Sequence, residues 1–118
     1  MEIYKKFTFE AAHLLPNVEK GHKCGQLHGH SFTVIIYAEG DVVDPYGWIV
    51  DFGYIKTAFK PILDRLDHSY LNEIEGLENP TSENLAVWIW DKLWAKFPKL
   101  SKVVVNETCS SGCAFKGV

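Results

Sequence analysis

Residues 28–39 read HGHSFTVIIYAE. Alternate positions from His28 to Ala38 carry histidine or apolar side chains, and a period of two residues is that of a β-strand. The other face holds Ile35 and Tyr37, so this strand is partly apolar on both faces. Such a strand needs a cover on each side, and we expect helices on one face and another subunit on the other.

Strands at both ends of the chain with two helices between them predict an α+β fold. The order is ββααββ, and we expect a four-stranded antiparallel sheet with both helices packed on one face, in a single domain of residues 1–118. The predicted elements are strands at 3–13, 28–39, 102–109 and 113–118, a helix at about 52–66 capped by Asp51, and a helix from Thr81 or Ser82 to about Phe97.

Composition excludes several classes of protein. Hydrophobic residues make up 47% of the chain and charged residues 23%, which is ordinary for a globular protein and excludes a disordered chain. A net charge of -3 and the absence of a basic stripe disfavour nucleic acid as a partner. The odd cysteine count, the start without an apolar block and the short apolar runs predict a reduced, cytoplasmic protein without a membrane partner.

A histidine trio is the strongest chemical signal. His28 and His30 are two residues apart on one strand, so their imidazoles share a face, and His13 ends the neighbouring strand on its apolar face. Catalytic zinc sites typically combine three protein ligands with a fourth position for water or substrate. The sequence predicts one zinc ion per chain, held by His13, His28 and His30. Cys24 could instead complete a structural site with four protein ligands, and the spacing leaves both possibilities open.

The segment CGQLHGH at 24–30 resembles the Cys-x3-His-Gly-His signature of bacterial 6-carboxytetrahydropterin synthases, which share a superfamily with the 6-pyruvoyltetrahydropterin synthases. Animal-type 6-pyruvoyl enzymes have a longer gap between the cysteine and the His-Gly-His. The resemblance covers nearly the whole chain, and six blocks in the same order are more specific than any one. The other five blocks are FEAAH at 9–13, GWIVDF at 47–52, LDH at 66–68, ENPTSE at 78–83 and ETC at 107–109.

This resemblance implies a tunnelling fold, whose subunits assemble through their sheets into an oligomeric barrel of three or six chains with active sites at subunit interfaces. It also implies a lyase that converts 7,8-dihydroneopterin triphosphate to 6-carboxy-5,6,7,8-tetrahydropterin, acetaldehyde and triphosphate, on the route to queuosine-type 7-deazapurines. Two alternatives stay open. One is a 6-pyruvoyl synthase, which eliminates triphosphate without cleaving the side chain, and the other is a noncatalytic module that binds zinc or pterin.

The resemblance also suggests which residues handle protons. It makes Cys24 the catalytic base, and Asp67 with His68 a pair that acts as general acid or base. Adjacent residues do not face each other on a helix. The two residues can therefore act together only if the chain turns at this point, or if their side chains enter the active site of a neighbouring subunit.

Substrate contacts are expected at five positions. A carboxylate on an apolar strand face needs a partner, and Glu107 can accept two parallel donors from a pterin ring, although a strand-end glutamate in water is the alternative. Thr81 and Ser82 are expected to contact the ring, although helix capping explains them equally well. His22 and Lys23 are expected to hold the triphosphate, although a solvated charged loop has the same composition.

Overall fold

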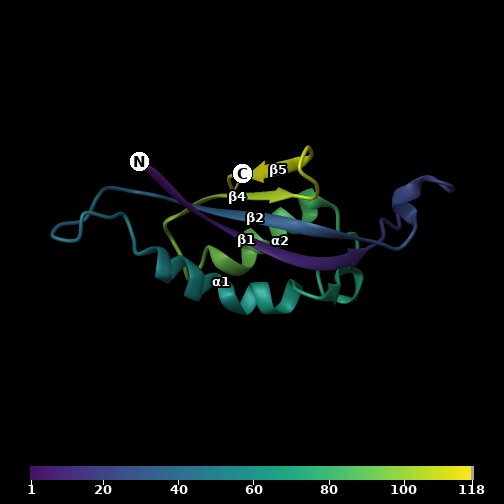
Figure 1. The fold of residues 1–118 in the computed structure, drawn as a ribbon, viewed down its shortest axis with the longest axis horizontal. Coiled ribbons are helices and arrows are strands. Elements are labelled where there is room, and N and C mark those ends of the chain that lie inside the picture. Colours follow the sequence, from purple (N-terminus) through teal and green to yellow (C-terminus); the bar gives the residue numbers. More distant parts are fainter. Residues whose placement is uncertain (118) are drawn as a thin grey trace.

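The computed structural model describes residues 1–117, in which two helices cover one face of a five-stranded sheet (Figure 1). This confirms the predicted α+β class. The elements in chain order are β1 (Glu2–His13), the short 3-10 helix η1 (Lys23–Gly25), β2 (His28–Glu39), α1 (Phe52–Leu66), β3 (Ser69–Tyr70), the 3-10 helix η2 (Leu71–Glu73), α2 (Ser82–Leu93), β4 (Leu100–Asn106) and β5 (Gly112–Phe115).

The sheet has the strand order β3-β1-β2-β4-β5. The four predicted strands pair antiparallel, and β1 faces β2 along its whole length, from Glu2 opposite Glu39 to His13 opposite His28. The predicted count of four strands is wrong, because β3 adds a fifth that runs parallel to β1. A strand of two residues is too short to show alternation, and the observed element order is therefore ββαβαββ.

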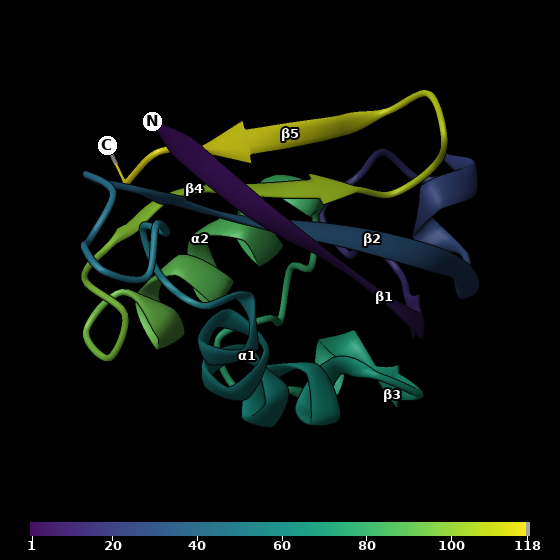
Figure 2. The same cartoon turned by 60° about the vertical axis from the view of Figure 1, so that its left-hand side comes forward.

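One core lies between the sheet and the helices, which Figure 2 shows on the same side of the sheet. On β1 and β2 the inward rings of Phe9 and Phe32 stack at 5.0 Å, and Phe59 of α1 packs 4.6 Å from Phe7. Asp51 caps α1 as predicted, because its side chain accepts a hydrogen bond from the backbone N–H of Gly53. Each large apolar side chain buried here contributes about 1.5–3 kcal/mol.

Several boundaries differ from the predicted ones. Helix α2 ends at Leu93, although Phe97 still packs in the core with 1% of its surface exposed. Strand β4 ends at Asn106, so Glu107 follows the strand instead of lying within it. A backbone bond from Glu107 N–H to the Ser111 carbonyl already belongs to the turn that leads into β5. The last predicted strand ends at Phe115, and its predicted end at Val118 lies outside the described residues.

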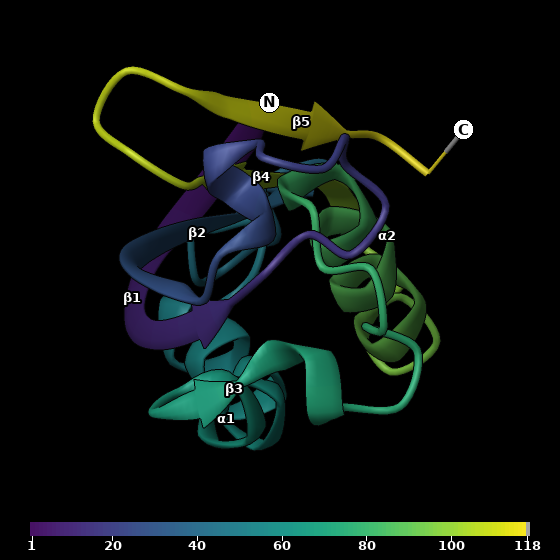
Figure 3. The same cartoon turned by 90° about the vertical axis from the view of Figure 1, so that its right-hand side faces the viewer.

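The molecule is long, with extents of 57 × 24 × 23 Å. The loop that carries η1 projects at one end and the loop after β2 projects at the other (Figure 1). Within residues 1–117, both helices lie on the core side of the sheet, and its other face carries none (Figure 3). No helix in this part of the chain is long and apolar enough to cross a membrane.

Candidate functional site

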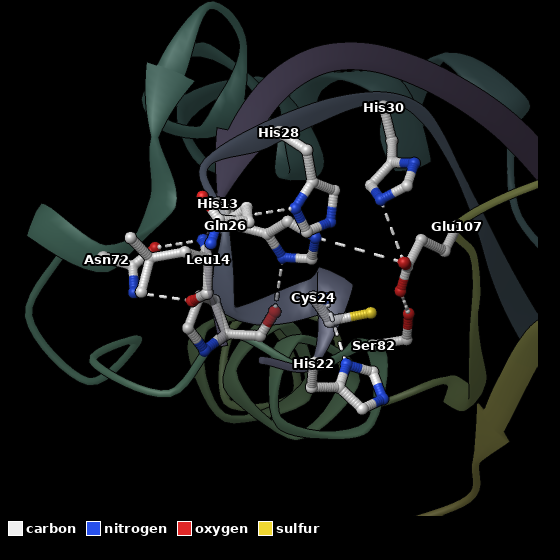
Figure 4. Close-up of polar contacts among 11 residues, drawn as sticks. His13, Leu14, His22, Cys24, Gln26, His28, His30, Asn72, Ser82 and Glu107 are labelled. Carbon is white, nitrogen blue, oxygen red and sulfur yellow. Dashed lines mark hydrogen bonds and ion pairs between the residues drawn. The ribbon is translucent and has the colours of Figure 1, made fainter. Parts of the chain in front are cut away.

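Three histidines lie together where the β1–β2 pair ends beside the η1 loop (Figure 4). His13 is the last residue of β1 and pairs with His28, the first residue of β2, while His30 lies on the same face two residues further. The ring centroids are 4.6 Å apart for His13 and His28, 5.1 Å for His13 and His30, and 4.8 Å for His28 and His30. The strand register therefore brings the three imidazoles together.

Backbone carbonyl groups orient two of these rings. Nδ1 of His13 lies 2.8 Å from the Pro80 carbonyl oxygen, and Nδ1 of His28 lies 2.7 Å from that of Gln26. A carbonyl oxygen can only accept, so each Nδ1 carries the proton and each Nε2 presents a lone pair. Burial lowers the pKa of His13 below its ordinary value and keeps this ring neutral. A neutral imidazole with its other nitrogen held by a carbonyl is the usual form of a metal ligand.

The donor atoms of this cluster fit a zinc ion. Nε2 of His13 and Nε2 of His30 are buried and make no hydrogen bond to any of the described residues. Leaving a buried polar atom unpaired costs about 1–3 kcal/mol, so a bound cation would stabilise both. One donor atom from each histidine and one carboxylate oxygen of Glu107 all lie within 4.8 Å of one another. Imidazole and carboxylate groups are both ligands that zinc accepts.

Glu107 lies closer to the histidines than a pterin contact alone would require. Its Oε1 is 2.9 Å from Nε2 of His30 and 4.0 Å from Nε2 of His13, although the angle at His30 is not that of a hydrogen bond. Its Oε2 accepts a hydrogen bond of 2.9 Å from the hydroxyl of Ser82, the buried first residue of α2. The carboxylate thus has the partners that its partly buried position demands.

Cys24 lies in η1 at the same end of the molecule and is half-buried. Its carbonyl accepts from Leu15 N–H at 2.8 Å, and its N–H donates to Nδ1 of His22 at 3.0 Å. In the view of Figure 4 its sulfur is drawn between the imidazoles and the Ser82–Glu107 pair. The sulfur is not one of the clustered donor atoms, so the alternative in which Cys24 is the fourth protein ligand is not formed here.

Asp67 and His68 meet because the chain turns where α1 ends. His68 has a φ of 58°, a left-handed conformation that a non-glycine residue seldom adopts. Its Nδ1 lies 3.1 Å from Oδ1 of Asp67, which also accepts from the backbone N–H of Glu10 at 2.9 Å. That bond from Glu10, with the contact to His68, lowers the pKa of Asp67 below its ordinary value. This turn therefore brings the adjacent side chains of Asp67 and His68 together, as their proposed pairing requires.

The Asp67–His68 pair does not join the histidine cluster of its own chain. The His68 side chain is 79% exposed and lines a surface hollow with Glu10 and Ser31, which lie on the outward face of the sheet. His13 and His30 lie on the inward face, as the alternation of buried and exposed residues along β1 and β2 shows. One chain therefore presents the two groups on opposite faces of its sheet.

The remaining candidates lie at the same end as the cluster. Thr81 caps α2, since its hydroxyl accepts from the backbone N–H of Asn84 at 3.1 Å. His22 and Lys23 are exposed in the η1 loop, and the ring of His22 caps η1. The sequence gives no signal for Asn72, whose side chain makes hydrogen bonds of 3.0 and 2.8 Å to the backbone of Leu14, next to His13.

Known proteins resemble the whole chain. The family model of 6-pyruvoyl tetrahydropterin synthase matches residues 2–118. A 6-carboxy-5,6,7,8-tetrahydropterin synthase from Synechocystis is 45% identical over 119 residues, which cover 96% of this chain and 91% of that protein. A dihydroneopterin monophosphate aldolase from Pyrococcus furiosus is 33% identical over 96 residues, covering 81% and 77%. The structure of Caenorhabditis elegans 6-pyruvoyl tetrahydropterin synthase matches with a TM-score of 0.92 at 26% identity, covering 100% and 96%.

Proposed function

This chain belongs to the 6-pyruvoyl tetrahydropterin synthase family, and we propose that it is a zinc-dependent 6-carboxy-5,6,7,8-tetrahydropterin synthase. Its substrate would be 7,8-dihydroneopterin triphosphate, and its products 6-carboxytetrahydropterin, acetaldehyde and triphosphate, on the route to queuosine. It would act in the cytoplasm as a homo-oligomer with interfacial active sites. The observation that carries this proposal is the cluster of three imidazoles, two of which have a buried Nε2 without a hydrogen-bond partner among the described residues, in a chain 45% identical to a synthase of this name.

His13, His28 and His30 would hold the zinc ion. When bound, zinc would supply Lewis acidity, which polarises the side-chain oxygens of the substrate and acidifies the adjacent C–H bonds. The carbonyl groups of Pro80 and Gln26 keep Nδ1 of His13 and of His28 protonated, so their Nε2 atoms stay available as ligands.

Proton transfer would be shared between Cys24 and the Asp67–His68 pair. Cys24 lies in the loop beside the cluster, and its thiolate would take the proton from the substrate carbon. Oδ1 of Asp67 holds Nδ1 of His68, which leaves Nε2 of that ring free to carry a proton. Because His68 is exposed on the outward face, it would reach the site of a neighbouring subunit.

Substrate binding would use the polar groups around the cluster. The carboxylate of Glu107 can accept two parallel N–H donors of the pterin ring, and Ser82 already holds one of its oxygens. His22 and Lys23 are exposed at the same end and offer cationic or neutral donors to the triphosphate. The Thr81 hydroxyl accepts from Asn84 N–H as the cap of α2, and its own O–H could still donate to the ring.

The test is to identify the products. Zinc-loaded protein is incubated with 7,8-dihydroneopterin triphosphate, with an acetaldehyde trap in the same tube, and the products are identified by mass spectrometry. Carboxytetrahydropterin with trapped acetaldehyde is the expected result, and Cys24→Ala should form neither.

A second candidate is a 6-pyruvoyl synthase, which the close match to the Caenorhabditis elegans fold favours. A pyruvoyl product without acetaldehyde would select it. Unchanged substrate in the presence of bound zinc would favour the noncatalytic binding module. Turnover of dihydroneopterin monophosphate, but not of the triphosphate, would favour the aldolase activity for which the Pyrococcus furiosus relative is named.

A further inference from the structure

His13 is held by contacts that come from distant parts of the chain. Its Nδ1 lies 2.8 Å from the carbonyl oxygen of Pro80, 67 residues away. By contrast, Nδ1 of His28 lies 2.7 Å from the carbonyl oxygen of Gln26, only two residues away. Strand β1 ends at His13, so the backbone beyond it needs support from outside the β1–β2 pair. The position of this candidate metal ligand therefore depends on tertiary contacts.

Asn72 supplies such support at the residue after His13. Its Oδ1 accepts from the backbone N–H of Leu14 at 3.0 Å, and its Nδ2 donates to the Leu14 carbonyl at 2.8 Å (Figure 4). Nδ2 also lies 3.4 Å from the carbonyl oxygen of Glu78, in the loop that leads to Pro80. One amide thus holds the backbone next to His13 and contacts the loop that orients its ring.

Asn72 also completes a series of contacts along the edge of β1 that faces away from β2. The backbone of Glu10 accepts from His68 N–H at 2.6 Å and donates to Oδ1 of Asp67 at 2.9 Å. Strand β3 then pairs in parallel with the two residues of β1 that follow Glu10. Asn72 makes the last contacts of this series, at Leu14. Residues 67–72 therefore lie along the edge that leads to the candidate metal ligand.

A series of contacts this short opens readily unless its end is fixed. Strand β3 has two residues, and His68 beside it has a φ of 58°, which costs free energy in a non-glycine residue. Segments with few contacts open locally far more often than the core of a protein. The two bonds from Asn72 to Leu14 fix the end next to the metal site. The order of β3 therefore depends on how firmly the backbone at His13 is held.

We propose that Asn72 is a positioning residue that couples the metal site on the inward face of the sheet to the Asp67–His68 pair on the outward face. When His13 binds a metal ion, the backbone of Leu14 is fixed with it, and Asn72 extends this constraint along the edge of β1. The turn at His68 then opens less often. Because coupling is reciprocal, an ordered turn also favours metal binding. The proposed function is needed only for the identity of the metal and the role of the Asp67–His68 pair.

Hydrogen exchange measured by mass spectrometry tests this coupling. Metal-free protein, prepared with a chelator, is compared with protein loaded with one zinc ion per chain. In the wild-type protein, zinc should slow exchange at residues 67–72 by about 5–150-fold, the usual range of coupling between two sites. Asn72→Ala loaded with the same amount of zinc should exchange at residues 67–72 as fast as its metal-free form.

Zinc affinity, measured by competition with a chelator, gives the reciprocal readout. Asn72→Ala should bind zinc about 10–100-fold more weakly, the usual effect of losing a group that orients a metal ligand. Asn72→Asp keeps the size of the side chain and the acceptor for Leu14 N–H, but it loses the donor to the carbonyls of Leu14 and Glu78. Its zinc affinity and its protection by zinc should both lie between those of the wild-type protein and of Asn72→Ala.

Asp51→Ala is the control for a general loss of stability. The Asp51 side chain accepts from Gly53 N–H at 2.9 Å and caps the start of α1, whereas Asp67 follows the end of this helix. The 15 residues of α1 separate the two positions by roughly 22 Å. Asp51→Ala should keep the wild-type zinc affinity and the zinc-dependent protection of residues 67–72. Circular dichroism checks that each variant is folded.

Equal exchange at residues 67–72 with and without zinc in the wild-type protein would overturn the proposal. So would protection by zinc that persists in Asn72→Ala, because the constraint would then reach His68 from a neighbouring subunit and not along β1. None of these measurements requires turnover. A protein that shows the coupling but leaves the substrate unchanged would overturn the proposed function and leave the role of Asn72 standing.

Discussion

The five histidines of this chain are distinguished by what their ring nitrogens contact. In His13 and His28 a backbone carbonyl takes up Nδ1, which leaves Nε2 for the cluster. In the exposed His22, Nδ1 accepts a backbone N–H and so belongs to a local cap. His68 is paired with a carboxylate on the outward face. Hydrogen bonding therefore separates His13 and His28, two of the three candidate metal ligands, from His22 and His68.

This difference predicts which histidine controls metal content. His28→Ala removes an imidazole from the cluster and should reduce bound zinc from about one ion per chain to well below that, because three ligands hold a catalytic zinc ion. His22→Ala is the control, because it removes an imidazole of the nearby η1 loop that is not part of the cluster. This variant should retain its zinc. Elemental analysis of dialysed protein measures both. Equal zinc in the two variants would contradict the assignment.

A second residue-scale prediction concerns Asp67 and acid. Bonding from Glu10 N–H and the contact with His68 hold the pKa of Asp67 below the ordinary value of 3.8, so its charged form stabilises the folded state. This contribution is fully present above the unfolded pKa and is lost as the pH falls through the lower folded pKa. Asp67→Asn keeps an acceptor oxygen but removes the charge.

The metal-free wild-type protein should therefore be more stable to urea than Asp67→Asn at about pH 6, and the difference should shrink toward about pH 3. Urea midpoints of the two proteins at both pH values measure it. A difference of the same size at both pH values would show that the charge of Asp67 is not what stabilises the turn.

At the scale of elements, the start of α2 combines a cap with a site residue. Thr81 accepts from Asn84 N–H and satisfies one free donor of the first turn, while Ser82 points to Glu107. Thr81→Ala should lower the free energy of unfolding by about 1 kcal/mol, and Thr81→Ser should not, because serine caps equally well. Urea unfolding of both variants measures this. A loss of the same size in Thr81→Ser would mean that the methyl group, not the cap, stabilises the helix.

The elements also show what the sequence can and cannot predict. Alternation placed His28 and His30 on one face of their strand and His13 on the apolar face of its own, because strand side chains repeat every two residues. The register that sets His13 opposite His28 is seen only in the structure. The apolar stripe predicted α1 with the bounds that the structure has, from Phe52 to Leu66. By contrast, β3 is formed by a backbone that turns at His68 and pairs with β1, and no side-chain pattern encodes so short a strand.

Parts of the site were also beyond prediction, for a different reason. Asn72 holds the backbone of Leu14 from a distance of 58 residues, and a single asparagine in a loop carries no signal of such a contact. The approach of Glu107 to His30 depends on where the turn after β4 begins. Periodicity determines which face a residue occupies, whereas contacts between loops depend on tertiary packing.

At the scale of the whole molecule, the proposed chemistry is split between the two faces of one sheet. The histidine cluster lies on the inward face and the exposed His68 lies on the outward face. The sequence pattern predicted that another subunit covers the outward face of β2. The outward Ile35 is already only 8% exposed in a single chain, so side chains of the same chain provide part of that cover. Tyr4 on the same face remains 52% exposed. The separation of Cys24 from His68 is thus the stronger reason to expect that subunits share a site.

Mixing two inactive variants tests this sharing. Cys24→Ala and His68→Ala should each lose turnover, because every site lacks one proton carrier. If Cys24 of one chain works with His68 of its neighbour, hybrid oligomers formed by co-expression should contain intact sites. Random assembly of equal amounts makes about a quarter of the sites intact in a closed ring, so activity should return to about a quarter of the wild-type value. Activity that stays absent in the hybrids would mean that both residues act within one chain, and full activity of His68→Ala alone would remove His68 from the reaction.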